Sequence, residues 1–365
     1  MNQERTLNGK RILVTGGLGC IGSNFIHYIL EKYPGIHVTN VDVRQFGFVP
    51  HHMHEQTLKK KYRYNYIHGD LCHPRVLTNA FGGDGFDYIV HFAAESHNSR
   101  AEKDPERAVH NNISATLALL ERARQVMGMK GWRTLQRLLY TSTCEVYGEQ
   151  ELGDAVRPFV EGDPLCPRTK YNITKAAADQ MVQVYSRDHG VPTIISRCSN
   201  IYGKYQAPEK LISKAARDLF SGERMTLYKA SDHLREWTHV LDKCRALELL
   251  LTHGALGEVY NIGSGEERSA EQVVKGVLGI SSREVDARYG GPEENFIEIV
   301  DGRRGHDKRY LLKSSKIQQL GWKPEISFED GLRETILWYA DNRPWWEAFP
   351  PVDLERSKAI LSPVS

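Results

Sequence analysis

The stretch Arg11–Gly22, RILVTGGLGCIG, decides the fold of this chain. Its first five residues form a short β-favouring run that predicts a buried strand. Gly16, Gly19 and Gly22 follow at once with the spacing GxxGxxG. Such glycines allow a tight turn and a close approach of the backbone to a pyrophosphate, and they aim the N-terminus of the next helix at the phosphates. We therefore expect a strand, a turn and a helix that together bind a dinucleotide.

Two aspartates extend this predicted site. Asp42 lies in the next predicted strand, His37–Val43, about twenty residues further on, where a carboxylate can accept both hydroxyls of a ribose. Its charge would repel a 2′-phosphate and so favours NAD over NADP, although Arg44 nearby weakens this preference. Asp70 follows a third predicted strand, Tyr66–Gly69, where an acid can meet the adenine amino group.

Beyond this end of the chain, short apolar runs alternate with helical patterns. The alternation predicts an α/β fold with a doubly wound parallel sheet. From about residue 203 the pattern loosens, which predicts a smaller C-terminal lobe that binds the substrate. The predicted strands and helices of the large domain are Arg11–Thr15, His37–Val43, Tyr66–Gly69, Tyr88–Phe92, Leu135–Ser142 and Thr193–Arg197, with helices at Ser23–Tyr33, Asn111–Met127 and Tyr171–His189. The predicted units are a mainly NAD-binding domain at 9–200, a mainly substrate-binding lobe with interleaved returns to the large domain at 201–346, and a C-terminal extension at 347–365.

Composition excludes several classes of protein. Among the 365 residues, Lys and Arg number 48 and Asp and Glu 46, so the formal net charge is +2 and nothing favours nucleic acid as a partner. No apolar run approaches the roughly 18 residues that cross a bilayer, and the polar N-terminus predicts no secretory segment. The six cysteines include no pair with CxxC spacing, so we expect no metal site, no disulfide framework and a cytoplasmic location.

Two further clusters carry chemistry. Residues 141–148, TSTCEVYG, come directly after a buried strand, and residues 171–175, YNITK, open a helix. Tyr171 and Lys175 are four residues apart and so lie on one helical face. The ammonium, together with a positive nicotinamide ring, would favour the tyrosinate form. Lowering a tyrosine pKa from about 10 to about 7 requires about 4 kcal/mol. Without the other clusters, such a pair also fits a plain surface helix.

The motifs TGGxGxxG, STxEVYG and YxxxK, in this order, resemble those of the extended short-chain dehydrogenase/reductase family. The resemblance is greatest to its dTDP-glucose 4,6-dehydratase branch and spans about residues 9–346. It implies a Rossmann fold whose smaller lobe closes over a nucleotide sugar carrying dTDP or UDP. Further segments that resemble the branch are HFAAESH at 91–97, RCSNIYGKYQAPEKLI at 197–212, LREWTHVLD at 234–242, YNIGSG at 260–265, RRGHDKRY at 303–310 and LGWKPEISFEDGLRETILWY at 320–339.

The resemblance assigns a role to each catalytic residue. Tyr171 would take the proton of the sugar 4-hydroxyl while NAD⁺ takes the C4 hydride, and Lys175 would hold the nicotinamide ribose and lower the tyrosine pKa. Thr143 would hydrogen-bond the same oxygen. Glu145 would take the C5 proton, after which the 6-hydroxyl leaves as water. The cofactor residues would be Gly16, Gly19, Cys20, Ile21, Gly22, Asp42, Asp70, Leu71, Ala93, Tyr171 and Lys175. The substrate residues would be Ser96, His97, Asn200, Lys210, Leu211, Arg235, Asn261, Arg303 and His306.

The chain departs from the branch at two places. The 4,6-dehydratases carry Thr-Asp-Glu where this chain has Thr143-Cys144-Glu145, and their aspartate protonates the departing hydroxyl. At residues 96–100 this chain has the sequence SHNSR, where the 4,6-dehydratases usually have SHVDR followed by a serine. A thiol, with a reference pKa of about 8.5, is mostly protonated at neutral pH, so Cys144 can serve as a proton donor or simply as packing.

The departures leave rival activities open. Thr-Cys-Glu also occurs in a related enzyme of tunicamycin biosynthesis that forms a 5,6-ene from UDP-N-acetylglucosamine, which makes a 5,6-dehydratase the main rival. UDP-glucuronate decarboxylases, with Thr-Ser-Glu, and 4-epimerases, which give Glu145 no necessary task, are weaker rivals. A non-enzymatic scaffold that binds NAD would be expected to lose the Tyr171 and Lys175 pair.

The resemblance also implies a homodimer. Helices Asn111–Met127 and Tyr171–His189 occupy the positions that form a four-helix bundle between subunits in this family. The small side chains of Ala176, Ala177 and Ala178 are expected to allow the helices of the two subunits to approach closely.

Overall fold

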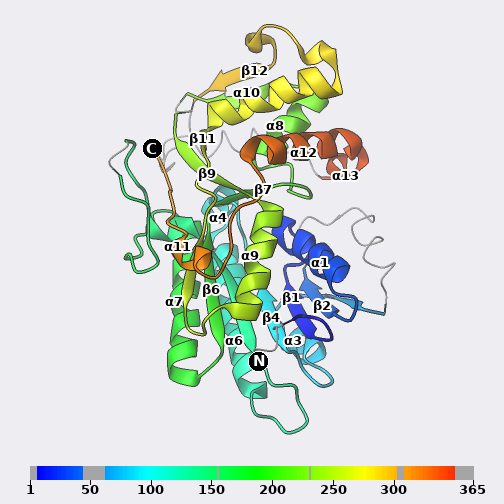
Figure 1. Cartoon of the computed structure of the whole chain (residues 1–365), viewed down its shortest axis with the longest axis vertical. Helices are drawn as coiled ribbons and strands as arrows, with labels where there is room; N and C mark the ends of the chain where they lie inside the picture. The colour runs from blue at the N-terminus through cyan, green and yellow to red at the C-terminus, as the bar shows by residue number, and fades with distance from the viewer. Residues whose placement is uncertain (1–5, 44–61, 154–155, 230–231, 302–307, 350–365) are drawn as a thin grey trace.

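The computed structural model describes residues 6–43, 62–153, 156–229, 232–301 and 308–349. Its centre is a seven-stranded sheet with the order β10-β6-β5-β4-β1-β2-β3 (Figure 1). All six strand pairings are parallel, which confirms the doubly wound α/β sheet predicted from the sequence. The strands are β1 (Arg11–Thr15), β2 (His37–Asp42), β3 (Tyr64–His68), β4 (Tyr88–His91), β5 (Arg137–Thr143), β6 (Thr193–Cys198) and β10 (Val259–Ile262).

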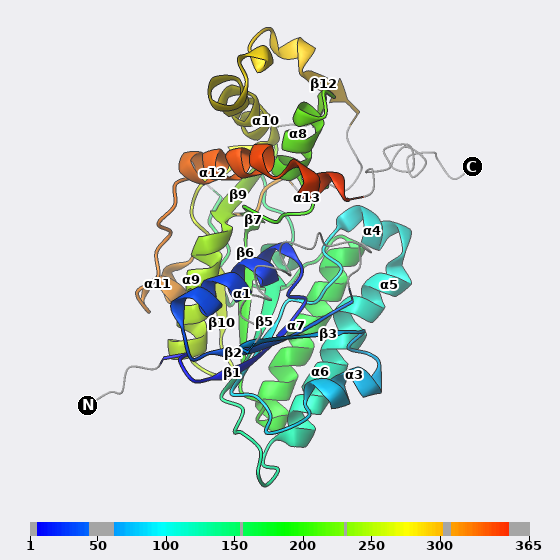
Figure 2. The same cartoon turned by 90° about the vertical axis from the view of Figure 1, so that its right-hand side faces the viewer.

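Helices cover both faces of this sheet (Figure 2). On one face lie α1 (Cys20–Lys32) and α9 (Val240–His253), and on the other lie α6 (Ala115–Val126) and α7 (Lys170–His189). Successive side chains of a strand point to opposite faces. In β1, Val14 accordingly packs into one hydrophobic core and Leu13 into the other, and neither is exposed. The sheet therefore separates two cores, as expected of a parallel sheet buried on both faces.

One predicted helix contains a turn of another kind. The expected helix Asn111–Met127 is wrong at its start, because a π-helical turn, η1 (His110–Ser114), precedes α6. The side chain of Asn112, 1% exposed, lies in this turn. Its Oδ1 accepts from the Glu95 amide at 2.7 Å, and its Nδ2 donates to Thr174 Oγ1 at 2.8 Å. The turn thus ties the loop after β4 to α7.

A second group of elements lies above the sheet in Figures 1 and 2. It contains α8 (Leu211–Phe220), α10 (Ala270–Ile280) and α12 (Phe328–Asp341), whose apolar faces share one hydrophobic core. Two small sheets join it, with strands β7 (Asn200–Tyr202), β8 (Met225–Tyr228), β9 (Leu234–His239), β11 (Glu267–Ser269) and β12 (Ile297–Val300). The remaining α-helices are α3 (Pro74–Ala80), α4 (Asn98–Lys103), α5 (Pro105–Val109), α11 (Ser315–Gln318) and α13 (Arg343–Glu347).

The strand order reverses beside β1. From β1 the chain passes to β2 and β3 on one side, and then to β4, β5 and β6 on the other. The loops that leave β1 and β4 therefore run in opposite directions and open a crevice at the carboxyl ends of the strands, which is where sheets of this kind bind ligands.

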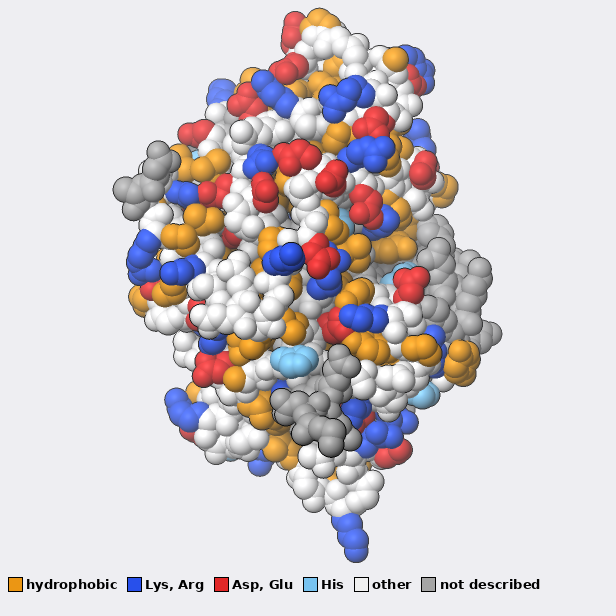
Figure 3. Space-filling view, in the orientation of Figure 1, with side chains coloured by type: hydrophobic (Ala, Val, Ile, Leu, Met, Phe, Trp, Pro, Cys, Tyr) orange, Lys and Arg blue, Asp and Glu red, His pale blue; other side chains and the backbone are white. Residues whose placement is uncertain are grey.

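The surface matches the near-neutral composition. On the face drawn in Figure 3, acidic and basic side chains are intermixed rather than gathered by sign. Within the described ranges, no helix combines the length and the apolar character that crossing a membrane requires.

Candidate active site

A cavity of about 390 Å³ lies in the crevice beside β1. It extends from Asp42 at the end of β2 and Asp70 after β3 to the cluster at the end of β5. Elements of the second group close its far side. The predicted site residues that line it are Gly16, Gly19, Cys20, Ile21, Gly22, Asp42, Asp70, Leu71, Ala93, Ser96, Thr143, Cys144, Glu145, Tyr171, Lys175, Asn200, Lys210 and Leu211. Residues predicted separately for cofactor, chemistry and substrate thus meet in one space.

The glycine turn has two different requirements. Gly16 has φ +72°, and a Cβ there would lie 2.5 Å from the Ala93 nitrogen, while a Cβ on Gly22 would lie 2.4 Å from the Gly16 oxygen. Both positions are therefore closed to side chains by the protein itself. A Cβ on Gly19 would meet only the Gly16 oxygen, at 3.4 Å. Gly19 lines the cavity. The absence of a side chain there leaves space for a ligand, whereas at Gly16 and Gly22 it avoids clashes within the protein.

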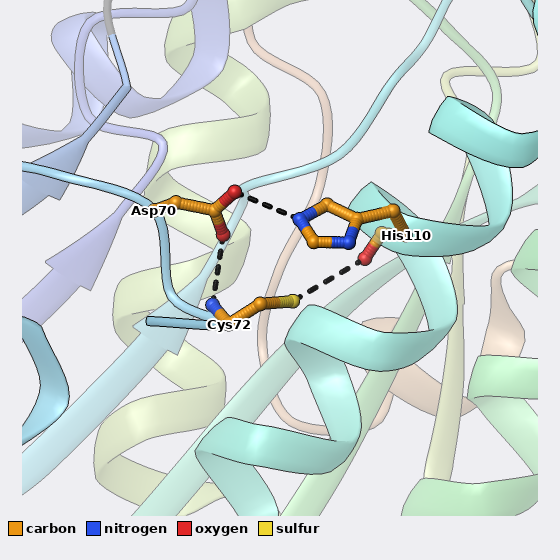
Figure 4. Close-up of side chains that lie close together, drawn as sticks. All are labelled: Asp70, Cys72 and His110. Atoms are coloured by element: carbon orange, nitrogen blue, oxygen red, sulfur yellow. Dashed lines mark hydrogen bonds and ion pairs between the residues drawn. The ribbon is translucent and has the colours of Figure 1, made fainter. Parts of the chain in front are cut away.

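The aspartates occupy the end of the cavity near the glycine turn. Asp42 Oδ2 accepts from the Leu18 amide at 3.0 Å, which fixes the carboxylate beside the turn. Asp70 accepts from His110 Nε2 at 2.8 Å and from the Cys72 amide at 2.8 Å (Figure 4). Burial alone would raise the pKa of Asp70, but these hydrogen bonds outweigh it and lower the pKa. The carboxylate is thus charged and held at the cavity wall.

Asp70, Cys72 and His110 also form the one cluster of three metal-ligand side chains found in the described part of the chain. Their donor atoms lie within 4.8 Å of one another. Burial and the nearby Asp70 raise the pKa of Cys72 to about 11, so its sulfur is a thiol and approaches the His110 carbonyl at 3.7 Å. The close packing of these groups is accounted for by hydrogen bonds.

The cluster after β5 begins where the strand ends. Thr143 Oγ1 accepts from the Glu145 amide at 3.2 Å and caps the short 3₁₀ helix η2 (Cys144–Tyr147). This cap turns Cys144 and Glu145 into the cavity. Burial raises the pKa of the Cys144 thiol well above its usual value, and the Glu145 carboxylate adds to the shift. The sulfur is therefore a protonated thiol, and the same shift makes it a weaker acid than an exposed cysteine.

Helix α7 supplies the other half of the catalytic centre. Thr169 caps the helix, so Tyr171 and Lys175 leave its first two turns toward the cavity. Lys175 Nζ donates to the Thr141 carbonyl at 2.7 Å and lies 4.3 Å from the centre of the Tyr140 ring. Burial lowers the pKa of Lys175 to about 8.

The pKa of Tyr171 shifts in the direction opposite to the prediction. Burial raises it well above 10, and the neighbouring Glu145 carboxylate adds to the rise. Desolvation of the phenol dominates here, and the Lys175 ammonium donates to the Thr141 carbonyl. The lowering by Lys175 is predicted for the site with NAD⁺ bound and stays a prediction. Tyr171 is a phenol in this structure, so its proton loss depends on a further positive charge.

The two groups of elements meet across the cavity mouth. Lys210, the residue that precedes α8, donates to the Ser96 carbonyl at 2.7 Å. Arg100 on α4 bonds to Glu95 through Nε and Nη2, at 2.9–3.1 Å, and to Glu209 through Nη1. These contacts join the loop after β4 to the segment before α8.

Five predicted substrate residues require correction or fall outside the description. Asn261 is unexposed, and its amide bonds to Tyr147 and to the Phe159 carbonyl, so it is structural and does not reach the cavity. Arg235 is also wrong as a lining residue, because its guanidinium lies over Tyr310 and bonds to backbone carbonyls. His97, which precedes α4, does not line the cavity either. Arg303 and His306, like residues 350–365 of the predicted extension, lie outside the described residues.

Sequence reasoning missed part of the lining. Several further polar or aromatic side chains lie in the last residues of β5 or β6, follow β6 or β7, or come from β9. They are Thr141, Ser142, Cys198, Ser199, Gln206, Glu209 and Trp237. Their position at the carboxyl ends of strands was the signal that could have identified Thr141, Ser142 and Cys198. Trp237 gave no such signal, because its approach depends on how the second group packs.

Comparisons with known proteins agree with this geometry. The family model for GDP-mannose 4,6 dehydratase matches residues 13–335. The chain is 36% identical over 353 residues to dTDP-glucose 4,6-dehydratase of Escherichia coli, covering 92% of this chain and 95% of the relative. It is 39% identical over 336 residues to the low-salt glycan biosynthesis protein Agl12 of Haloferax volcanii, covering 90% and 98%.

A solved structure is similar over the same length. The dTDP-glucose 4,6-dehydratase of Streptomyces venezuelae, crystallised with NAD bound, superposes with a TM-score of 0.82 at 35% identity. The match covers 92% of this chain and 99% of that one. The family model, the relatives and this structure agree across nearly the whole chain, and the chain belongs to the GDP-mannose 4,6 dehydratase family.

Proposed function

We propose that this protein is an NAD-dependent nucleotide-sugar dehydratase, a hydro-lyase that acts on a dTDP- or UDP-hexose and releases the 6-hydroxyl as water. The observation that carries the proposal is the meeting of Thr143, Cys144 and Glu145 with Tyr171 and Lys175 in one cavity that continues to the glycine turn. An acid, a base and an oxidation centre are all needed for this reaction, and each has a candidate here.

The cavity fits NAD. Gly19 leaves space beside the N-terminus of α1, where a pyrophosphate is stabilised by the helix end, and Asp42 is placed for the ribose hydroxyls. Similar enzymes are crystallised with NAD, as the Streptomyces venezuelae structure is. When bound, NAD⁺ would supply a hydride acceptor for C4 of the sugar and a positive ring that favours loss of the Tyr171 proton, and its reduced form would return the hydride after water leaves, to C6 in a 4,6-reaction or to C4 in a 5,6-reaction.

The residues of the chain then divide the proton transfers. Tyr171 accepts the proton of the 4-hydroxyl, and Thr143 hydrogen-bonds the same oxygen. The resulting 4-ketone acidifies the C5 hydrogen, which Glu145 removes as a proton. The thiol of Cys144 protonates the 6-hydroxyl, so that the C6–O bond breaks and water leaves. Its raised pKa keeps the thiol in the form this step requires.

Cys144 also supports a second candidate activity. The 5,6-dehydratase suggested by the Thr-Cys-Glu motif uses the same oxidation and the same loss of water, but it leaves a double bond between C5 and C6. A thiol 1% exposed at the cavity wall is compatible with this outcome because it adds no charge beside the sugar. Decarboxylation of a UDP-glucuronate and 4-epimerisation are the remaining alternatives.

A panel of nucleotide sugars tests the proposal. The purified protein is incubated with dTDP-glucose, UDP-glucose, UDP-N-acetylglucosamine and UDP-glucuronate, and products are read by mass and NMR. Loss of water with a 4-ketone supports the 4,6-reaction, and loss of water with a vinylic C6 supports the 5,6-reaction. Loss of carbon dioxide, a change at C4 alone, or no reduced cofactor with any sugar contradicts dehydration.

The first prediction concerns the cofactor. Gly19→Val is expected to fold normally, because the protein itself leaves room at this position, and to lose bound NAD, because the side chain fills the ligand's space. The variant should melt within a few degrees of the wild type and carry at least about tenfold less NAD, measured after denaturation. Gly16→Val is the contrasting variant and should lose stability as well, since its Cβ meets backbone. Full NAD content in Gly19→Val would place the pyrophosphate elsewhere.

The homodimer is also part of the proposal, through the same two helices that the sequence predicts, where Ala177 is partly exposed. Ala176 and Ala178 belong to the subunit's own cores, so they cannot form an interface. Exposed apolar side chains instead lie on the neighbouring helices α6 and α7, among them Leu117 at 39%, Ile173 at 51% and Val184 at 36% exposure. Surfaces of this kind on packed helices are typical of subunit contacts.

The second prediction tests this surface. Leu117→Glu is expected to convert a dimer into a monomer at micromolar concentration, because it places a charge inside the apolar contact. Leu256→Glu is the matched control, since Leu256 is 52% exposed but lies after α9, away from these helices. Sedimentation gives the mass of each. A wild-type monomer, or a dimer unaffected by Leu117→Glu, contradicts the proposed interface.

A reducing, cytoplasmic location completes the proposal. All six cysteines of the chain are unpaired, and Cys144, Cys198 and Cys244 are buried. Unpaired thiols are the usual state where disulfides do not form.

A further inference from the structure

Asn98 lies at the mouth of the cavity and contacts the candidate C5 base. Its Nδ2 donates to Glu145 Oε2 at 3.2 Å. The same side chain accepts from Thr169 Oγ1 through its Oδ1, at 2.9 Å. One amide therefore links the carboxylate to the residue that caps α7, the helix that carries Tyr171. Asn98 itself does not line the cavity.

The platform that holds Asn98 is firmly anchored. Asn98 opens α4, and Arg100 on the same helix bonds to Glu95, whose side chain is 2% exposed. The backbone amide of Glu95 is in turn fixed by Asn112. At the other end of α4, Glu102 pairs with Lys170 of α7 at 2.8 Å. Contacts that do not involve the Asn98 side chain therefore hold α4 to the loop after β4 and to α7.

If the oxygen and the nitrogen of the Asn98 amide exchanged places, the hydrogen bond to Glu145 would be lost. Thr169 Oγ1 accepts from the Asn172 amide at 3.2 Å, so its own hydrogen is free for the Asn98 oxygen. The Asn98 nitrogen is left facing Glu145 as a donor. A hydrogen bond to an ionised carboxylate stabilises the charged form and fixes its direction. The valine usual at this place in the dehydratase branch offers no such donor.

We propose that Asn98 is a positioning residue that holds the Glu145 carboxylate, through its amide nitrogen, in the direction needed to remove the C5 proton. The inference rests on the proposed function, since it requires Glu145 to act as the base. The proposed effect of Asn98 on the chemistry passes through Glu145, while its bond to Thr169 fixes the amide. Its loss is expected to affect the C5 step and to leave the preceding oxidation at C4 unchanged.

The test separates these two steps in a single turnover in D₂O, with dTDP-glucose and UDP-N-acetylglucosamine as the two probes. Absorbance of the reduced cofactor follows the oxidation. NMR follows loss of the C5 hydrogen, either as deuterium at C5 of a 4-keto product or as a new double bond between C5 and C6. Asn98→Leu, which matches the size of the side chain and removes both hydrogen bonds, is expected to oxidise at the wild-type rate and to exchange the C5 hydrogen about tenfold more slowly, the usual worth of a hydrogen bond to a charged group.

Two further variants distinguish positioning from packing. Asn98→Gln keeps an N–H donor on a longer chain and is expected to recover part of the exchange rate. Asn98→Asp keeps the shape and the bond from Thr169 but replaces the donor with a second carboxylate, so it is expected to exchange no faster than Asn98→Leu. Lys103→Ala, exposed on the same helix, is the control for the integrity of α4 and should match the wild type in both steps.

Each failure has its own meaning. A wild-type enzyme that oxidises neither probe, or that removes the C5 hydrogen of neither, contradicts the proposed function. A wild-type enzyme that exchanges the C5 hydrogen while Asn98→Leu exchanges it equally fast overturns the inference and leaves the function intact. Equal slowing of oxidation and exchange in Asn98→Leu also overturns it, because that result means general disruption of the site. So does equal recovery in Asn98→Gln and Asn98→Asp.

Discussion

Glu145→Gln is expected to stop the reaction between oxidation and elimination. The amide keeps the size of the side chain but cannot accept a proton, so C4 should still be oxidised while the C5 hydrogen is retained. Overall turnover should fall by about 10²–10⁴-fold, the usual contribution of a positioned base. Reduced cofactor and a keto-sugar should accumulate, and NMR in D₂O should find no deuterium at C5.

Glu151→Gln is the matched control for this result. Glu151 lies six residues further along the chain and forms a surface ion pair with Lys308, whose contribution to stability is small. It should behave as the wild type. If Glu145→Gln incorporates deuterium at the wild-type rate, the base is another residue, and the assignment of the C5 step fails.

Cys144→Ala is expected to stop the reaction one step later. The thiol lies at the cavity wall and stays protonated because burial raises its pKa. Its loss removes the acid but not the base, so the C5 hydrogen should exchange with D₂O as in the wild type. Release of water should slow by about 10²–10⁴-fold, as expected for a positioned general acid. Mass analysis of products withdrawn over time measures the release.

Two other cysteine variants serve as a control and as a comparison for this result. Cys166→Ala is the control, because Cys166 is exposed and does not line the cavity. Cys144→Asp restores the commoner Thr-Asp-Glu motif and is expected to keep elimination and to move the product toward the 4-keto sugar. Water release at the wild-type rate in Cys144→Ala would make Cys144 a packing residue and leave the acid to be found.

Much of the fold was predictable because its signals are local. Arg11–Thr15 is the strand that the sequence predicts, with the same bounds, since a short apolar run followed by glycines has few other conformations. Helix α1 starts three residues earlier than predicted, at Cys20. Its N-cap residue is Gly19, which has no side chain to mark the start of a helix in the sequence. The π-helical turn around Asn112 had no signal, since it depends on partners at Glu95 and Thr174.

The site divides in the same way. The residues next to strand ends line the cavity as expected, because parallel strands bring their carboxyl ends to one edge. Asn261 could not be placed from its motif, since only the folded chain shows that Tyr147 and Phe159 occupy its amide. In the sequence, Asn98 stands out only as part of a departure from the usual SHVDRS motif. Its meaning depends on two residues, Glu145 and Thr169, that lie 47 and 71 positions further along the chain.

The two cores on either side of β1 have a consequence for how such enzymes diversify. Leu13 and Val14 point into different cores, so inserting or deleting one residue in β1 would send each side chain to the wrong face. The interior of the sheet is therefore closed to gradual change. The residues just beyond the carboxyl end of each strand, the rim, can change more easily, because they border the cavity. Cys144, one position beyond β5, is such a place: a single codon can exchange the proton donor while both cores keep their packing. New chemistry on this scaffold is expected to arise at the rim and to cost the fold little.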